Sequence, residues 1–193
     1  MIIGITGPTG SGKTTLLKQV ERLGGMVLDC DQIYHALLQT APALLSAIEA
    51  RFPGSVEHGI LQRKKLGAIV FSDKEALADL DKITHAAIKN EVFRQLKDKP
   101  GLVAIDAIGL FESKLNELCD VTVAVTAPEE IRVRRLMDRE RISEDYARSR
   151  IAAQKSAAEF EALCDQTLVN DGDLPTFQAK CLAFFEELGI MKA

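Results

Sequence analysis

Two patterns of hydrophobic and polar residues alternate along the chain and predict an α/β fold. Short apolar runs rich in β-branched residues are typical of buried strands. Such runs span residues 1–6, 26–29, 102–105, 121–125 and 167–170. Between them, apolar residues recur at helical spacing; in residues 14–23, Leu16, Leu17 and Val20 share one face. Strands that alternate with helices favour a sheet covered by helices.

The turn between the first strand and the first helix carries a phosphate-binding motif. Its sequence, Gly7-Pro8-Thr9-Gly10-Ser11-Gly12-Lys13-Thr14, fits the Walker A pattern G-x-x-x-x-G-K-[ST]. The three glycines permit positive φ angles, so that backbone N–H groups point into one concavity at the helix N-terminus. We expect Lys13 to reach the β- and γ-phosphates of a nucleotide and the Thr14 hydroxyl to bind the bridging Mg²⁺.

Acidic residues follow two of the predicted strands, where α/β proteins bind their ligands. Asp29 and Asp31 end the second strand. Asp31 also suits the N-cap of the next helix, so capping and a catalytic or metal-sphere role both remain open. Asp106 ends the third strand and resembles a Walker B acid, which would hold Mg²⁺ through water. Residues 106–109 also match the D-x-x-G of GTPases, but the chain has no guanine-specific N-K-x-D.

A helical block separates the second and third strands. The pattern from Pro42 to Lys99 is helical almost throughout, which is long for a simple crossover. We therefore interpret it as an insertion that builds the site for a second substrate. Its basic cluster, residues 63–65, suits either a solvated helix face or phosphate contact. His85 lies between apolar helical neighbours, as structural histidines often do.

Arginines gather in the stretch after the fourth strand. There are seven between residues 132 and 150: Arg132, Arg134, Arg135, Arg139, Arg141, Arg148 and Arg150. Glu140, Glu144 and Asp145 could pair with some of them on exposed faces. The remainder suit a mobile lid that brings guanidinium groups to the charge on a transferred phosphoryl group.

Composition narrows the range of functions. The chain has 193 residues, enough for one domain with an insertion, and a net charge of −4. Such a charge does not favour nucleic acid or an anionic membrane as a partner. The chain has no long apolar span or signal segment, so we expect a cytoplasmic protein. The four cysteines are widely spaced, which favours reduced thiols over a zinc site or disulfides.

The chain as a whole resembles the dephospho-coenzyme A kinase family. The similarity is collinear and departs from the family pattern at Ile108-Gly109 and His85-Ala86. It rests on residues 6–15, Asp29-Cys30-Asp31, Gly59–Arg63 with Leu66, Val70-Phe71, Thr84-His85, Leu110-Phe111-Glu112, Arg135, Arg139, Ile151 with Gln154, and Asp165 with Asn170 and Gly172.

The resemblance implies a role for individual residues. Asp31 would be the acid that meets the acceptor hydroxyl, and Arg63, His85 and Glu112 would surround the acceptor. Arg135 and Arg139 would belong to the lid, with Arg139 acting in catalysis beside Lys13. The nucleotide would be bound by Gly7, Gly10, Ser11, Gly12, Lys13, Thr14, Thr15, Arg135 and Asn170.

The family also implies an architecture and a reaction. We expect a three-layer P-loop fold whose five parallel strands have the order 2-3-1-4-5. The core would comprise residues 1–30, 100–137 and 158–193, the acceptor-binding insertion 31–99, and the lid 138–157. The enzyme, a monomer or weak homo-oligomer, would use ATP and Mg²⁺ to phosphorylate the ribose 3′-hydroxyl of dephospho-CoA. The alternatives are another nucleoside or nucleotide kinase and a nucleotide-dependent switch ATPase.

Overall fold

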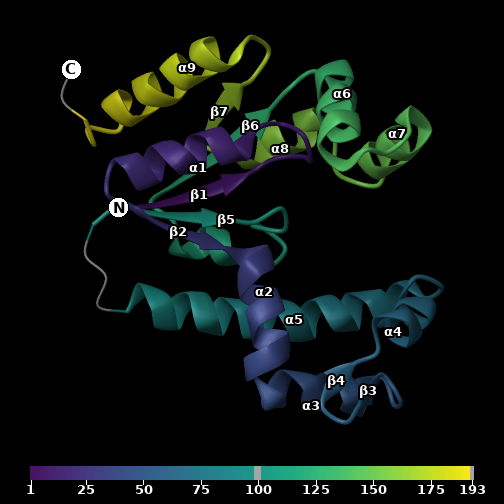
Figure 1. Ribbon diagram of the computed structural model, residues 1–193. Helices are drawn as coiled ribbons and strands as arrows, with labels where there is room; N and C mark the ends of the chain where they lie inside the picture. Colours follow the sequence, from purple (N-terminus) through teal and green to yellow (C-terminus); the bar gives the residue numbers. More distant parts are fainter. Residues whose placement is uncertain (98–100, 192–193) are drawn as a thin grey trace. The chain divides into compact units, whose positions relative to one another are not determined.

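The computed structural model describes residues 1–97 and 101–191, which divide into two compact units (Figure 1). The first unit comprises Met1–Val27, Gly101–Phe111 and Leu115–Ala193. The second comprises Leu28–Pro100 and Glu112–Lys114. The expected boundary at residues 99 and 100 lies outside the described residues, as do the last two residues of the expected core. The division into core, insertion and lid therefore stays a prediction.

A parallel sheet organises the first unit. In the described residues its strands are β1 (Ile2–Thr6), β2 (Met26–Asp29), β5 (Val103–Asp106), β6 (Val121–Thr126) and β7 (Gln166–Val169). The last two residues of β2 are counted with the second unit. Their spatial order is β2-β5-β1-β6-β7. Counted along the chain this is the order 2-3-1-4-5 that the resemblance implies. Ile3 of β1 is in register with Ala104 of β5 on one side and Val121 of β6 on the other.

Helices cover both faces of this sheet. Those that contact its strands are α1 (Lys13–Arg22), η1 (Leu115–Leu118), α8 (Ala157–Leu163) and α9 (Leu174–Glu187). Helices α6 (Glu129–Glu140) and α7 (Glu144–Ala152) pack against each other around a small core of their own. Helices α1 and α9 lie side by side and pack on Ile3 and Ile5 (Figure 1). Gly4 faces the other way, where an added Cβ would come within 2.8 Å of Leu110 and Cys119. The expected three-layer fold is confirmed.

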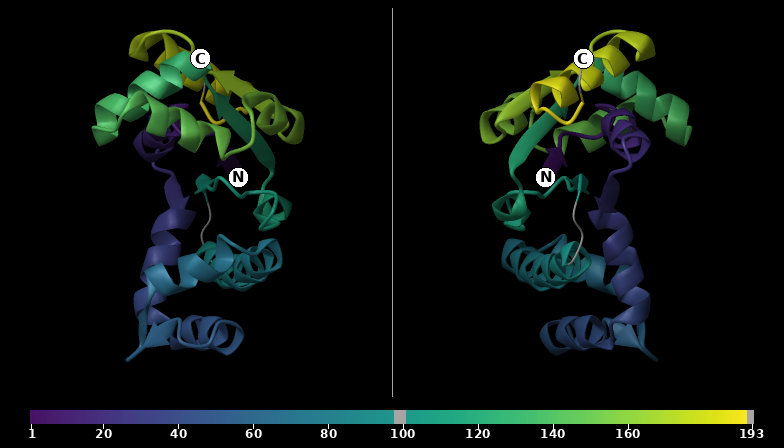
Figure 2. Two further views of the ribbon diagram at one scale, coloured as in Figure 1. Left: turned by 90° about the vertical axis from the view of Figure 1, so that its right-hand side faces the viewer. Right: turned by 90° about the vertical axis from the view of Figure 1, so that its left-hand side faces the viewer.

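The second unit is helical and has its own core. It contains α2 (Cys30–Thr40), α3 (Pro42–Arg51), α4 (Arg63–Val70), α5 (Lys74–Leu96) and a short hairpin of β3 (Val56–Glu57) and β4 (Ile60–Leu61). Helix α5 is continuous and packs against α2, α3 and α4 (Figures 1 and 2). Ile48, Phe52, Leu66 and Val70 are buried at the centre of this core.

The start of α2 corrects one sequence-based prediction. Asp29, rather than Asp31, is the N-cap: one of its oxygens accepts hydrogen bonds from the backbone N–H groups of Asp31 and Gln32, both at 3.0 Å. Asp31 lies in the first turn instead. Either aspartate is a good cap by type, so the helix starts where the backbone of β2 leaves the extended conformation. The second unit also pairs β3 with β4, within a stretch whose pattern predicted helix almost throughout.

The structure bears on two further expectations. Within residues 1–97 and 101–191, no helix is both long and apolar enough to cross a membrane. Cys30, Cys119, Cys164 and Cys181 are all free thiols, as expected. Burial raises the pKa of the Cys119 thiol to about 12, with smaller contributions from Asp120 and Asp165. Cys119 therefore stays protonated at neutral pH.

Candidate active site

The loop between β1 and α1 has the backbone geometry that the motif predicts for an anion site. Lys13 Nζ donates a hydrogen bond to the Gly7 carbonyl oxygen at 2.8 Å, so its charge stays on the loop. Gly12 is the N-cap of α1, with φ 100°, and no side chain in the described part of the chain caps this helix. The first N–H groups of α1 are therefore not used by a capping side chain, and the helix dipole adds positive potential there.

Side chains from α6 and from the end of β7 hold the loop by its carbonyl groups. Arg135 Nη1 donates to the carbonyl oxygens of Gly10 and Ser11, both at 3.2 Å. Arg135 Nη2 donates to Asn170 Oδ1 at 3.1 Å, and Asn170 Nδ2 donates to the Ser11 carbonyl oxygen at 2.8 Å. A Cβ at Gly12 would lie 2.2 Å from Asn170 Nδ2, so only glycine fits. Arg135 and Asn170 therefore contact the loop that is expected to bind nucleotide.

Four other predicted nucleotide or metal residues lie on or near this loop. Thr14 is exposed. At the start of α1, the Thr15 N–H donates a hydrogen bond to the Gly12 carbonyl oxygen at 2.9 Å. Ser11 is buried, and its hydroxyl has no hydrogen-bond partner among the described residues. Asp106 is the half-buried last residue of β5.

The donor set fits Mg²⁺ bound together with a nucleotide. Within the described residues no group of three or more His, Cys, Asp or Glu side chains could hold a metal by itself. Mg²⁺ in kinases usually takes one or two protein oxygens and fills its other positions with phosphate and water. The exposed Thr14 hydroxyl and the Asp106 carboxylate are oxygen donors of that type.

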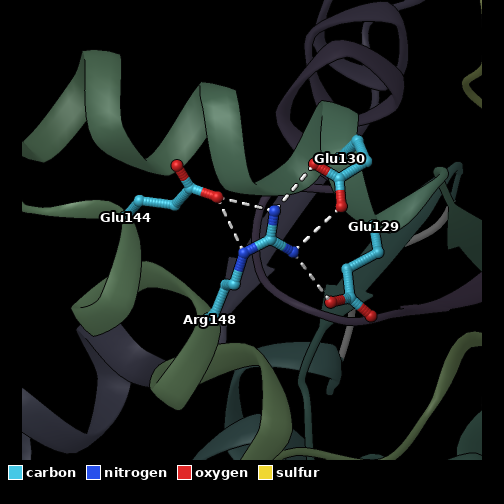
Figure 3. Close-up of polar contacts among 4 residues, drawn as sticks. All are labelled: Glu129, Glu130, Glu144 and Arg148. Atoms are coloured by element: carbon cyan, nitrogen blue, oxygen red, sulfur yellow. Dashed lines mark hydrogen bonds and ion pairs between the residues drawn. The ribbon is translucent and has the colours of Figure 1, made fainter.

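Several arginines of α6 and α7 form ion pairs in this structure. Arg148 binds Glu130 through two parallel hydrogen bonds of 2.9 Å and also contacts Glu129 and Glu144 (Figure 3). Glu130 and Glu129 lie in the first turn of α6, so Arg148 ties α7 to that turn. These contacts agree with the surface-pair interpretation for Arg148.

Arg139, the arginine expected to act in catalysis, is also paired. Its Nη2 donates to Glu140 Oε1 at 2.5 Å, and the other oxygen of Glu140 binds Arg150. The Arg139 side chain is still 59% exposed. It can therefore leave Glu140 for a phosphate at little cost, because exposed ion pairs are weak.

Asp31, Arg63, His85 and Glu112, the residues expected at the acceptor, all belong to the second unit. Asp31 is exposed, and its carboxylate makes no hydrogen bond or ion pair with another described residue. Asp29 differs, since both of its oxygens accept hydrogen bonds from the first turn of α2. Asp31 is thus the carboxylate that is available to a ligand.

The second unit contains a cavity of about 320 Å³ with mostly apolar walls. Its lining comes from α2, β4, α4 and α5 and comprises Tyr34, His35, Leu61, Arg63, Leu66, Gly67, Val70, Phe71 and Leu80. Arg63 Nη2 lies 3.2 Å from His35 Nδ1. Because a guanidinium only donates, His35 accepts at Nδ1 and carries its proton on Nε2. A cation and an imidazole therefore stand beside an apolar cavity.

His85 and Glu112 do not line this cavity. His85 is half-buried in α5. Lys89, one turn further along α5, donates to the Lys114 carbonyl oxygen at 2.9 Å. This bond fastens residues 112–114, and with them the exposed Glu112, to the helix that carries His85.

Comparison with known proteins identifies the family. The family model described as dephospho-CoA kinase matches residues 1–176. The chain belongs to the dephospho-CoA kinase family. A curated dephospho-CoA kinase of Aromatoleum aromaticum is 33% identical over 183 residues, covering 93% of this chain and 89% of that protein. The resemblance seen in the sequence is thereby confirmed.

Solved structures agree with this family. The crystal structure of TT1252 from Thermus thermophilus matches with a TM-score of 0.81 and 32% identity over 97% of both chains. A dephospho-CoA kinase from Campylobacter jejuni matches with a TM-score of 0.67 and 26% identity over 98% of both. As a member of this kinase family, the chain uses a nucleotide as phosphoryl donor and a small molecule as acceptor.

Some residues of this candidate site were not predicted from the sequence. Tyr34 and His35 line the cavity, yet they look like ordinary helical residues in the sequence. Gln154 Oε1 accepts from the Thr9 N–H at 2.8 Å; it was part of the resemblance but had no role assigned. Arg132 of α6 contacts the loop between β1 and α1, which is called the phosphate loop below. In the sequence it was only one member of the arginine cluster. The roles of all these site residues stay proposals.

Proposed function

We propose that this chain transfers the γ-phosphate of ATP to the ribose 3′-hydroxyl of dephospho-CoA and releases CoA and ADP, the last step of CoA biosynthesis. The observation that carries the proposal is the uncapped N-terminus of α1 with Lys13 on its loop, in a member of the dephospho-CoA kinase family. That arrangement binds phosphate by geometry and charge. Family membership supplies the identity of the acceptor.

ATP would bind with its β- and γ-phosphates in the loop. The N–H groups at the start of α1 would bind phosphate oxygens, and Lys13 would exchange its bond to Gly7 for one to the γ-phosphate. Thr14 would hold Mg²⁺ directly and Asp106 through water. The ion neutralises charge on the phosphates when it is bound.

Dephospho-CoA would bind to the second unit. Its pantetheine arm is long, and the methyl and methylene groups beside its amides suit a cavity walled by Leu61, Leu66 and Phe71. Arg63 at the same cavity would bind acceptor phosphate, with a planar fork of donors suited to it. Phe71 lines this cavity and is 85% exposed, so its ring is accessible to a ligand there.

Asp31 would align the acceptor hydroxyl. Phosphoryl transfer passes through a loose transition state with charge on the transferred group, so positioning and electrostatics do most of the catalysis. The Asp31 carboxylate can accept the hydrogen bond of the 3′-hydroxyl and take its proton late in the transfer. Arg139 would leave Glu140 and stabilise charge on the phosphoryl group as the lid closes.

The alternatives weighed from the sequence are not favoured. Neither a nucleoside or nucleotide kinase nor a switch ATPase agrees with the family match over residues 1–176. Action in the cytoplasm, as a monomer or weak homo-oligomer, stays a prediction.

An acceptor panel tests the proposal. The purified chain is incubated with ATP and Mg²⁺ and with dephospho-CoA, AMP or adenosine, and products are identified by mass. We expect kcat/KM for dephospho-CoA to exceed that for AMP by at least about 100-fold, because remote binding energy positions the reacting hydroxyl. Equal values would favour a nucleotide kinase. ATP turnover that no acceptor stimulates would favour a switch.

A further inference from the structure

Arg132 of α6 is unusual because it is a buried arginine without a carboxylate partner. Its side chain is only 3% exposed, and no acidic side chain of the described residues lies within ion-pair distance. Arginines are almost never this buried unless they are paired. Burial also lowers the pKa of its guanidinium. Transfer of the Arg132 guanidinium from water to the protein interior costs free energy, which other interactions must offset.

The contact that Arg132 makes instead is with the phosphate loop. Its Nε donates to the Thr9 carbonyl oxygen at 2.9 Å. The backbone of the same residue abuts the next loop residue, since a Cβ at Gly10 would lie 3.0 Å from the Arg132 carbonyl oxygen. Its Nη2 is buried and has no hydrogen-bond partner among the described residues. The bond from Nε to Thr9 is therefore the one that connects the side chain to the loop.

Peptide geometry connects this bond to nucleotide binding. The Thr9 carbonyl and the Gly10 N–H belong to one planar trans peptide and point in opposite directions. Holding the carbonyl towards α6 therefore turns the Gly10 N–H away from α6. Arg135 and Asn170 hold the next two carbonyls, those of Gly10 and Ser11, in the same way. Three successive peptides of the loop are thus oriented by side chains on its outer side.

We propose that Arg132 is a positioning residue that orients the Thr9–Gly10 peptide, and through it a phosphate-binding N–H, without contacting the nucleotide itself. This inference rests on the proposed function, because it assumes that the loop binds nucleotide phosphate. It assigns Arg132 to the binding of the donor and gives it no part in binding the acceptor.

Two substitutions of equal charge and length isolate the hydrogen bond. In Arg132→Gln the amide Nε2 stands the same number of bonds from Cα as the arginine Nε, so it can donate to the Thr9 carbonyl. In Arg132→Met the methyl group occupies that place and cannot donate. Both remove the positive charge. Arg134→Met, at an exposed arginine of the same helix, serves as the control for charge.

The readouts are the Kd for ADP with Mg²⁺, measured by calorimetry without acceptor, and the KM for dephospho-CoA. We expect Arg132→Met to weaken ADP binding about tenfold, the effect of losing one charged hydrogen bond. Arg132→Gln should stay within about threefold of the wild type, and Arg134→Met should match it. The KM for dephospho-CoA should not change in any variant. If Arg132 had a purely structural role, Arg132→Met would lower the melting temperature. It would not weaken ADP binding while leaving the KM for dephospho-CoA unchanged.

Equal ADP affinities for the Gln and Met variants would overturn the inference, whether both were weak or both were tight. If Arg132→Met fails to fold, Arg132→Gln decides alone, and a loss of tenfold or more in that variant would also overturn it. A wild-type chain that bound no ADP would refute the proposed function itself. The two failures are therefore distinguishable.

Discussion

Asp29 and Asp31 stand two residues apart, and the structure gives them different surroundings. Asp29 uses both carboxylate oxygens to cap α2, whereas the Asp31 carboxylate faces solvent. We predict that Asp31→Asn lowers kcat by about 10²- to 10⁴-fold, because asparagine keeps the shape but cannot take a proton. The melting temperature and the affinity for ATP should change little, since the cap is Asp29. Steady-state kinetics, calorimetry and thermal unfolding measure these three quantities.

Asp29→Asn is the matched control for Asp31→Asn. It removes the same charge from the same helix start, and asparagine is about as good an N-cap as aspartate. It should retain more activity than the Asp31 variant. Equal losses in the two variants would mean that negative charge alone matters, and near-normal kcat for Asp31→Asn would remove Asp31 from the mechanism.

At the level of single residues, positions within a local motif were easier to predict than contacts. The place of Lys13 and Thr14 after the loop between β1 and α1 could be predicted, because the strand–loop–helix setting of the Walker motif is visible in the chain. The cap could not be assigned, since two aspartates of equal propensity lie within one turn. Arg132 could not be separated from its neighbours, because burial depends on what α6 packs against rather than on residue type.

Among the elements, α7 is joined to α6 both by a buried apolar cluster, in which Val133 and Leu136 meet Ala147 and Ile151, and by charge. Arg148 reaches Glu144 within its own helix and Glu129 and Glu130 in the first turn of α6 (Figure 3). We predict that Arg148→Met raises amide hydrogen exchange over residues 144–152 by about fivefold or less, the range for exposed pairs. Lys18→Met on the exposed side of α1 is the control. Unchanged exchange in α7 would show that its apolar contacts alone hold it.

The same pair has a defined pH dependence. Hydrogen bonds from Arg148 lower the pKa of Glu130 in the folded chain. The contribution of Glu130 is thus fully present above the unfolded pKa of about 4.3 and is lost as pH falls through the lower folded value. The difference in melting temperature between wild type and Arg148→Met should therefore be constant near neutral pH and shrink below about pH 4. A difference that grew in acid would contradict this assignment.

The elements themselves were largely predictable. Each strand of the sheet was visible as an apolar run, since parallel strands are buried on both faces. The arginine-rich stretch was more ambiguous. Ion pairs satisfy Arg139, Arg148 and Arg150, while Arg132 and Arg135 contact the phosphate loop. The surface-pair interpretation holds for the first three, because adjacent positions of a helix face different neighbours. The lid interpretation stays a prediction.

At the scale of the whole molecule, the residues with proposed roles divide between the two units. Lys13, Arg135 and Asn170 belong to the first unit, and Asp31 and Arg63 to the second. The strand order came from the family resemblance, because apolar runs do not show which strands are neighbours. The cavity of the second unit was not predictable, since its walls come from four elements that only packing brings together.

The position of the transferred phosphate tests the central claim most directly. The chain is incubated with dephospho-CoA, Mg²⁺ and ATP whose γ-phosphate carries ¹⁸O, and the products are examined by ³¹P NMR and mass spectrometry. We predict labelled phosphate on the ribose 3′-oxygen of CoA and an equal amount of unlabelled ADP. Label that appears in free phosphate, with dephospho-CoA unchanged, or on any other hydroxyl would contradict the proposed function.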